Sequence, residues 1–286
     1  MALQRAAVAS ILLFTLVTDV FTGVVSSSAI RITPCEMVIT KPGVYVLDTA
    51  NRYGLCSLKV RAAPDQNVQL TVEAADVACG GEEPKLLVVD GWQLRDPRTG
   101  ARAEWPADSD SVDVCDGLPD QDESVLVVVS RGNIAEVLYR FSPHESATVH
   151  VDFLENDYPC NMLVSLDDFY RNLTVAANGD GGDAPYVRNC QVLLPGQIKI
   201  GIDATSLSEV GCDDGVNNGS MVTIHAGNTM SNLPAQQKFC SGRRIRMIPC
   251  QFIRMNVRFT NANERVIFKV VPADAVQSLM KAHICY

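Results

Sequence analysis

The sequence predicts an all-β protein made of antiparallel β-sandwiches that are cross-linked by disulfides. Short runs rich in β-branched residues recur between turn residues, helical signals are few, and the chain contains ten cysteines. The hydrophobic content of 47% is enough to build packed cores, which argues against a disordered chain.

Several of these runs alternate apolar with polar residues, as strands with one buried face do. The clearest is 252–259, in which Arg254, Asn256 and Arg258 alternate with apolar side chains. We expect one short helix over residues 274–282 and the longest loops over 90–113 and 178–189. The other predicted strands are 43–47, 68–72, 86–89, 124–129, 136–141, 147–153, 197–202, 221–225 and 265–271.

The first 29 residues have the features of a cleaved secretory signal peptide. Arg5 precedes an apolar run over residues 6–17, and small residues follow up to Ala29. A membrane span would need about 20 apolar residues, which this run does not reach. No later segment is apolar and long enough either, so we expect a secreted, extracellular protein without a membrane anchor.

All ten cysteines lie after residue 29, and an even count in an exported chain predicts five disulfides. Zinc sites need closely spaced thiolates, but the nearest pair, Cys240 and Cys250, has nine residues between its members. We therefore expect no metal site and no cofactor. Spacing leaves the connectivity open, and the simplest scheme joins neighbours: Cys35–Cys56, Cys79–Cys115, Cys160–Cys190, Cys212–Cys240 and Cys250–Cys285.

A polar stretch at residues 155–159 is a plausible domain boundary. It divides the cysteines into four and six. We therefore predict an N-terminal domain over residues 30–155 and a C-terminal domain over residues 156–286.

The net charge of −9 is unevenly distributed along the chain. Residues 79–124 contain twelve acidic and four basic side chains, whereas residues 241–286 contain eight basic and two acidic ones. The acidic excess argues against nucleic-acid binding, which requires phosphate neutralisation. The basic segment could bind an acidic partner, although the exposed faces of ordinary strands are the favoured explanation.

No motif for catalysis is complete in this sequence. Serine hydrolases need a nucleophile beside a histidine base, and no G-x-S-x-G element is present. Metalloproteases need two histidines one helical turn apart, which His144, His150, His225 and His283 do not provide. We therefore predict that the protein is not an enzyme.

Two kinds of polar site remain open. Glu82, Glu83, Asp90 and Asp113 could together bind calcium, although such residues more often occupy solvated turns. The sequons at Asn172 and Asn218 predict N-linked glycans on an exported chain.

Particular stretches resemble an invertebrate member of the corticotropin-releasing-factor-binding protein (CRF-BP) family. Cys79-Gly-Gly-Glu82, residues 87–94 with their Asp-Gly-Trp, and Val112-Asp-Val-Cys115 are similar to the first CUB-like domain of that family. The order and spacing of the cysteines are similar too. Further matching stretches lie at residues 157–161, 188–190, 211–212 and 263–268.

This resemblance implies two CUB-like jelly-roll domains with consecutive disulfides. It also implies a function, which is to sequester a corticotropin-releasing-factor-like peptide hormone, of the urocortin or diuretic-hormone type, and so to limit receptor activation. Such ligands are amphipathic helical peptides, so an apolar groove is the expected receptor surface. The competing hypothesis is a calcium-dependent adhesion or scaffold protein with CUB-like domains.

The resemblance also assigns ligand-binding residues. In the family, an arginine four residues before the first cysteine and an acidic residue two after it are tied to ligand binding. Here Arg31 occupies the first position and Met37 the second, with Glu36 beside it. Because Met37 is not acidic, this sequence departs from the family at the second position. Glu36 could supply the acidic group instead, but adjacent residues of a strand point to opposite faces. Arg31 could also belong to a frayed N-terminus of the mature chain.

Overall fold

We describe the 286-residue chain from a computed structural model. The structure describes residues 29–48, 54–73, 77–79, 85–95, 102–106, 110–117, 125–178, 186–208, 219–230 and 233–273. Strands are the main regular structure of these residues, and their only helical elements are α1 (Val114–Gly117) and a 3-10 turn at Leu166–Asp168. The predicted all-β fold class is confirmed.

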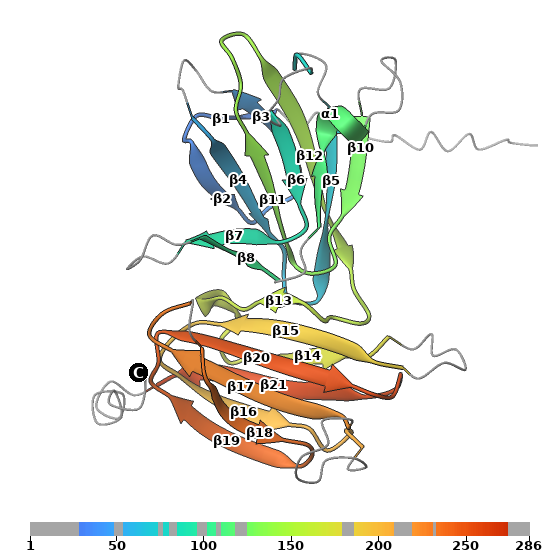
Figure 1. Cartoon of the computed structure of the whole chain (residues 1–286), viewed down its shortest axis with the longest axis vertical. Helices are drawn as coiled ribbons and strands as arrows, with labels where there is room; N and C mark the ends of the chain where they lie inside the picture. Colours follow the sequence, from blue (N-terminus) through green and yellow to red (C-terminus); the bar gives the residue numbers. More distant parts are fainter. Residues whose placement is uncertain are drawn as a thin grey trace, which may run out of the picture.

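Ten of the strands between residues 30 and 155 form two five-stranded sheets that enclose one apolar core (Figure 1). We call this part the N-terminal sandwich. One sheet has the order β1 (Ile30–Ile32), β3 (Gly43–Asp48), β12 (Ser146–Glu155), β5 (Gln66–Glu73) and β10 (Val125–Val129). The other has the order β2 (Glu36–Ile39), β4 (Cys56–Arg61), β11 (Ile134–Tyr139), β6 (Leu86–Val89) and β9 (Ser111–Asp113).

The strands between residues 162 and 272 form a second pair of sheets around a separate core, which we call the C-terminal sandwich (Figure 1). One sheet has the order β13 (Met162–Leu163), β15 (Arg188–Leu194), β20 (Phe252–Phe259), β17 (Met221–Gly227) and β18 (Ala235–Phe239). The other has the order β14 (Asn172–Ala176), β21 (Arg265–Pro272), β16 (Ile198–Asp203) and β19 (Arg243–Ile248). In β20, Ile253, Met255, Val257 and Phe259 are buried, as the alternation predicts.

Three strand pairs are parallel, in contrast to the purely antiparallel sheets that we expected. They are β1 with β3, β2 with β4 and β13 with β15. The chain runs from β1 into β2 of the opposite sheet before it returns as β3, and such a crossover brings the chain back in the same direction.

The prediction of one long loop over residues 90–113 is wrong. This segment contains a hairpin of β7 (Trp92–Arg95) and β8 (Arg102–Trp105), and then β9. Gly91 has a φ of +135°, and a Cβ at this position would lie 2.3 Å from the carbonyl oxygen of Trp105. Only glycine fits there, which explains the Asp-Gly-Trp sequence at the start of the hairpin.

The second loop prediction, over residues 178–189, is too long at its end, because β15 begins at Arg188. Its middle part and the predicted helix over residues 274–282 lie outside the described residues.

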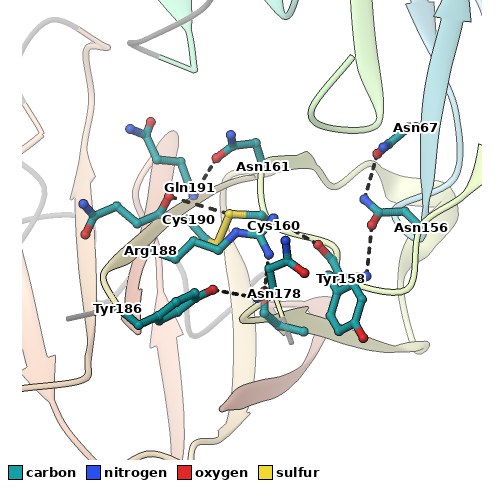
Figure 2. Close-up of a disulfide and its surroundings, with 12 residues drawn as sticks. Asn67, Asn156, Tyr158, Cys160, Asn161, Asn178, Tyr186, Arg188, Cys190 and Gln191 are labelled. Carbon is teal, nitrogen blue, oxygen red and sulfur yellow. Dashed lines mark hydrogen bonds between the residues drawn. A yellow bond between two sulfur atoms is a disulfide. The ribbon is translucent and has the colours of Figure 1, made fainter. Parts of the chain in front are cut away.

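The segment between β12 and β13 is held by hydrogen bonds and a disulfide (Figure 2). The side chain of Asn156 donates to Asn67 Oδ1 at 2.7 Å, and Arg188 Nη2 donates to the carbonyl oxygen of Tyr158 at 3.3 Å. Asn161 Oδ1 accepts from the backbone N–H of Gln191 at 3.1 Å. The stretches at residues 157–161 and 188–190, which contribute to the family resemblance, therefore have a structural role here.

The two sandwiches also contact each other directly. Asn133, which is fully buried, donates from Nδ2 to the carbonyl oxygen of Leu163 at 3.0 Å and accepts from the N–H of Leu163 at 2.8 Å. Gly132 forms an isolated bridge with Asn161, and a Cβ on Gly132 would lie 2.1 Å from the carbonyl oxygen of Asn161. A small apolar cluster covers this contact: Trp92, Trp105, Ile134, Leu193 and Leu163.

Three of the five predicted disulfides are present, and they are Cys35–Cys56, Cys79–Cys115 and Cys160–Cys190. Cys240 and Cys250 are also disulfide-bonded. The partners predicted for these two, Cys212 and Cys285, lie outside the described residues.

Candidate functional site

One open edge of the N-terminal sandwich is formed by β1 and β2. Each is the outermost strand of its sheet (Figure 1). The Cys35–Cys56 disulfide ties the turn between them to β4. Because β1 and β2 belong to opposite sheets, their outward side chains lie on opposite faces of the sandwich. The predicted ligand-binding residues are all on these two strands.

Arg31 is an outward residue of β1. The next residue, Ile32, is buried in the core, whereas the Arg31 side chain is 68% exposed. Its Nη1 donates to Asp48 Oδ2 at 2.8 Å, so the arginine is ordered by an ion pair along the sheet. Exposed ion pairs of this kind contribute little to stability, so Arg31 has no strong structural role.

Glu36 and Met37 point to opposite faces of β2. Glu36 is exposed, whereas Met37 packs against the apolar core. Arg31 and Glu36 therefore lie on the same edge but on opposite faces of it. A ligand that contacts both has to lie across the edge.

Exposed apolar side chains accompany the charged residues. Ile30 of β1 and Val38 of β2 are each 51% exposed, and Leu55, just before β4, is 37% exposed. The family resemblance predicts an apolar groove, whereas the described residues of this edge supply three exposed apolar side chains.

Glu36 stands at the mouth of a small cleft of about 70 Å³ on the outer face of its sheet. The cleft is bounded by β2, β4, β11 and the β7–β8 hairpin. Its lining residues are Glu36, Leu55, Cys56, Ser57, Lys59, Gln93, Glu136 and Leu138.

Glu136 forms the buried floor of this cleft. Its Oε2 accepts from the backbone N–H of Gln93 at 2.6 Å, and its Oε1 lies 3.9 Å from Lys59 Nζ. Burial raises the pKa of Glu136 above its ordinary value, and the contacts with Gln93, Lys59 and Ser57 offset part of this rise. Glu36 adds a further, smaller increase in the same pKa. The two carboxyl groups therefore give the cleft acceptor character.

Sequence reasoning missed Glu136. A glutamate on a strand is normally a solvated residue, and the covering β7–β8 hairpin was itself expected to be a loop. One signal was available: the run Ile134–Tyr139 is otherwise almost wholly apolar, as expected for a strand covered on both faces, and all six residues are buried.

The carboxylates considered for calcium are engaged in other contacts where the structure describes them. Asp90 accepts from the Arg131 backbone N–H at 2.9 Å and from its Nε at 2.6 Å, and Asp113 accepts from the N–H of Cys115. Glu82 and Glu83 lie outside the described residues. In the described part of the chain, no three His, Cys, Asp or Glu side chains are grouped closely enough to bind a metal ion.

Two of the three described histidines lie on strands, where they contact a carboxylate and a backbone carbonyl oxygen. His150 on β12 lies 3.2 Å from Glu73, and His225 on β17 contacts the carbonyl oxygen of Leu233. Burial lowers the pKa of His225, and the positive charge of Arg254 lowers it further. Both side chains are parts of strand faces.

Of the two sequon asparagines, the structure describes Asn172 but not Asn218. Asn172 is exposed at the start of β14, where a glycan would have room. Asn218 lies outside the described residues, although Ser220 of its sequon is fully buried and bonds to Glu264 Oε2 at 2.5 Å.

No helix that is long and apolar enough to cross a bilayer occurs in the described ranges.

No protein-family model and no curated protein matches this chain. Among solved structures, the CUB1-EGF-CUB2 domains of rat MASP-1 are similar at 13% identity, over 82% of this chain and 99% of that one, with a TM-score of 0.26. The corresponding human MASP-1/3 domains match at 11% identity over 80% and 99%, with a TM-score of 0.24. The extracellular region of zebrafish Gpr126/Adgrg6 matches at 10% identity over 87% and 38%, with a TM-score of 0.30. With identities under 25% and TM-scores under 0.5, these similarities assign no function to this chain.

Proposed function

We propose that this chain is an exported binding protein that sequesters a peptide hormone of the corticotropin-releasing-factor type and thereby limits receptor activation. The observation that carries this proposal is the β1–β2 edge. It presents Arg31, which occupies the first position that the family resemblance points to, and Glu36, the acidic neighbour of the second position, Met37, together with exposed Ile30, Val38 and Leu55.

The edge suits an amphipathic helical peptide. The three apolar side chains would cover part of the apolar face of the helix, since burial of apolar area drives such binding. The Arg31 guanidinium would bind a carboxylate of the peptide, and the carboxylate of Glu36 would accept from a basic or amide group. Sequestration then follows from mass action, because bound hormone is withheld from its receptor.

We propose binding rather than catalysis at the small cleft that is lined by Glu36 and Glu136. Its lining includes carboxyl, ammonium and hydroxyl groups, but neither a histidine nor a free thiol. The Ser57 side chain donates to Glu136, and Glu136 holds the backbone of the β7–β8 hairpin. These groups are thus engaged in supporting the fold.

The proposal predicts the effect of substitutions at the edge. Arg31→Ala and Glu36→Ala should each weaken the binding of an amidated corticotropin-releasing-factor-like peptide by at least several-fold, measured by calorimetric titration, because each removes a charge-assisted contact worth about 1.5–3 kcal/mol. Arg171→Ala is the matched control, since this exposed arginine lies in the other sandwich. Unchanged affinity in a folded Arg31→Ala variant would remove Arg31 from the site.

A further inference from the structure

The open side of the C-terminal sandwich carries a row of cations. β19 begins with Arg243-Arg244-Ile245-Arg246, and all four residues are exposed. β19 is the outermost strand of its sheet, and β18, the outermost strand of the facing sheet, adds the exposed Lys238. Four cations therefore lie along one edge of a chain whose net charge is −9.

These arginines are only partly neutralised. Arg243 Nε donates to Asp203 Oδ2 at 2.8 Å. Arg244 bonds to a backbone carbonyl oxygen, and Arg246 Nε donates to Gln237 Oε1 at 2.8 Å. Within the described ranges, neither Arg244 nor Arg246 forms an ion pair with a carboxylate, so two positive charges are available to an anion.

The cationic side chains of β19 are spaced along the edge of the sheet. Arg244 and Arg246 are two residues apart on one strand face, which places them about 6.6 to 6.8 Å apart along the strand. Arg243 points to the other face, where the exposed Lys199 continues the cationic surface on β16. A ligand that runs along β19 and uses both Arg244 and Arg246 is linear and carries repeated anionic groups.

Polar groups with both donors and acceptors adjoin the cations. A cleft of about 320 Å³ between β18 and β19 has Gln236, Gln237 and Arg246 at its polar side, and its remaining lining residues are apolar: Ile224, Ile245, Met247, Ile248, Pro249 and Cys250. Amide side chains donate to and accept from hydroxyl groups. No aromatic side chain lines the cleft. Repeated anions together with hydroxyl groups are the chemistry of a sulfated polysaccharide.

We propose that the β18–β19 edge binds a sulfated polysaccharide of the glycosaminoglycan class. The argument is charge complementarity: a linear polyanion neutralises a row of arginines and releases its counterions. This second site lies on the sandwich that does not carry the proposed peptide site, and it does not depend on peptide binding.

The test is binding of heparin by the disulfide-bonded protein. The wild-type protein should be retained on heparin-agarose at about 0.15 M salt. The double variant Arg244→Gln/Arg246→Gln should elute at lower salt and bind a size-defined heparin oligosaccharide at least about tenfold more weakly. The control Lys41→Gln/Arg171→Gln removes two exposed cations elsewhere, so net charge is matched, and it should elute as the wild-type protein does.

Three results would overturn the proposal. The first is no retention of the wild-type protein at about 0.15 M salt, and the second is equal weakening in both double variants, which would indicate nonspecific attraction. The third is competition by poly-glutamate as effective as that by heparin, which would favour an acidic peptide as partner. Binding of the peptide hormone is measured on the same variants and should be unchanged. Failure of the polysaccharide proposal can therefore be distinguished from failure of the hormone proposal.

Discussion

At the scale of single residues, two glutamates are buried although charged side chains normally lie at the surface. Glu136 is a charged side chain on a strand whose other residues are apolar, and it is buried because a hairpin covers it. Glu264 is similar: its carboxylate accepts from Ser208 N, Ser220 Oγ and the turn at Asn261. Buried carboxylates with several donors hold loops in place, which accounts for their presence in the cores.

Glu136 makes stability depend on pH in a defined direction. Its pKa is raised in the folded protein, so the folded state binds a proton more tightly than the unfolded chain does. The contribution of this group to stability is therefore present at low pH and is lost as pH rises through the raised pKa. Glu136→Gln cannot ionise, but its side-chain oxygen can still accept from Gln93 N–H.

We expect the free energy of unfolding of Glu136→Gln, relative to the wild-type protein, to increase from pH 4 to pH 7. Urea unfolding at both pH values, with disulfides intact, measures this difference. A relative stability that falls over the same interval would show that the carboxylate is stabilised by Lys59 rather than penalised by burial.

At the scale of elements, the indole of Trp92 attaches the β7–β8 hairpin to the sheet in addition to the contact between Gln93 and Glu136. Trp92 Nε1 donates to the carbonyl oxygens of Val60 and Ala135, at 3.2 and 3.0 Å. Trp105, its partner across the hairpin, is as deeply buried, but its Nε1 has no hydrogen-bond partner.

This asymmetry predicts different costs for the same substitution. Trp92→Phe should destabilise the protein by about 1–3 kcal/mol, because it leaves buried carbonyl oxygens without their donor. Trp105→Phe should cost clearly less, since it removes a buried donor that is already unsatisfied. Chemical denaturation of both variants gives the comparison, and equal costs would mean that the indole volume alone matters.

The elements that the sequence predicts well are those with one buried and one solvated face. The strand at Phe252–Phe259 is predicted to the residue, because its polar side chains alternate strictly with apolar ones. The β7–β8 hairpin was missed, since its polar sequence has the composition of a loop and its burial depends on distant strands. At the candidate site, Arg31 and Glu36 came from the family resemblance, whereas Glu136 requires the tertiary structure. The Asp-Gly-Trp and Arg188–Cys190 stretches that carry the resemblance build the fold and do not line the candidate site.

At the scale of the whole molecule, the contact between the two sandwiches depends on a close backbone approach at Gly132. Any side chain there would meet the carbonyl oxygen of Asn161. Gly201 on β16 is a matched control, because a Cβ at that position has no heavy atom within 4 Å.

We expect Gly132→Ala to lower the free energy of unfolding by at least about 2 kcal/mol, because strain at a packed backbone contact has few ways to relax. Gly201→Ala should change it by less than about 1 kcal/mol. Small-angle X-ray scattering of Gly132→Ala should also show a larger radius of gyration if the sandwiches separate. Wild-type stability in Gly132→Ala would mean that the junction tolerates displacement.

The two proposed binding surfaces lie on different sandwiches: the peptide site is on the N-terminal sandwich and the polyanion site is on the C-terminal sandwich. Binding at one should leave affinity at the other unchanged, because no shared residue connects them. Titration of peptide into the heparin-bound protein tests this independence.

Calorimetric titration of the disulfide-bonded protein with an amidated corticotropin-releasing-factor-like peptide, run with and without a calcium chelator, is the decisive measurement. We predict saturable binding that is the same in both conditions and is weakened by Arg31→Ala. Absence of binding by protein with intact disulfides would contradict hormone sequestration, and binding that the chelator abolishes would favour a calcium-dependent adhesion or scaffold protein instead.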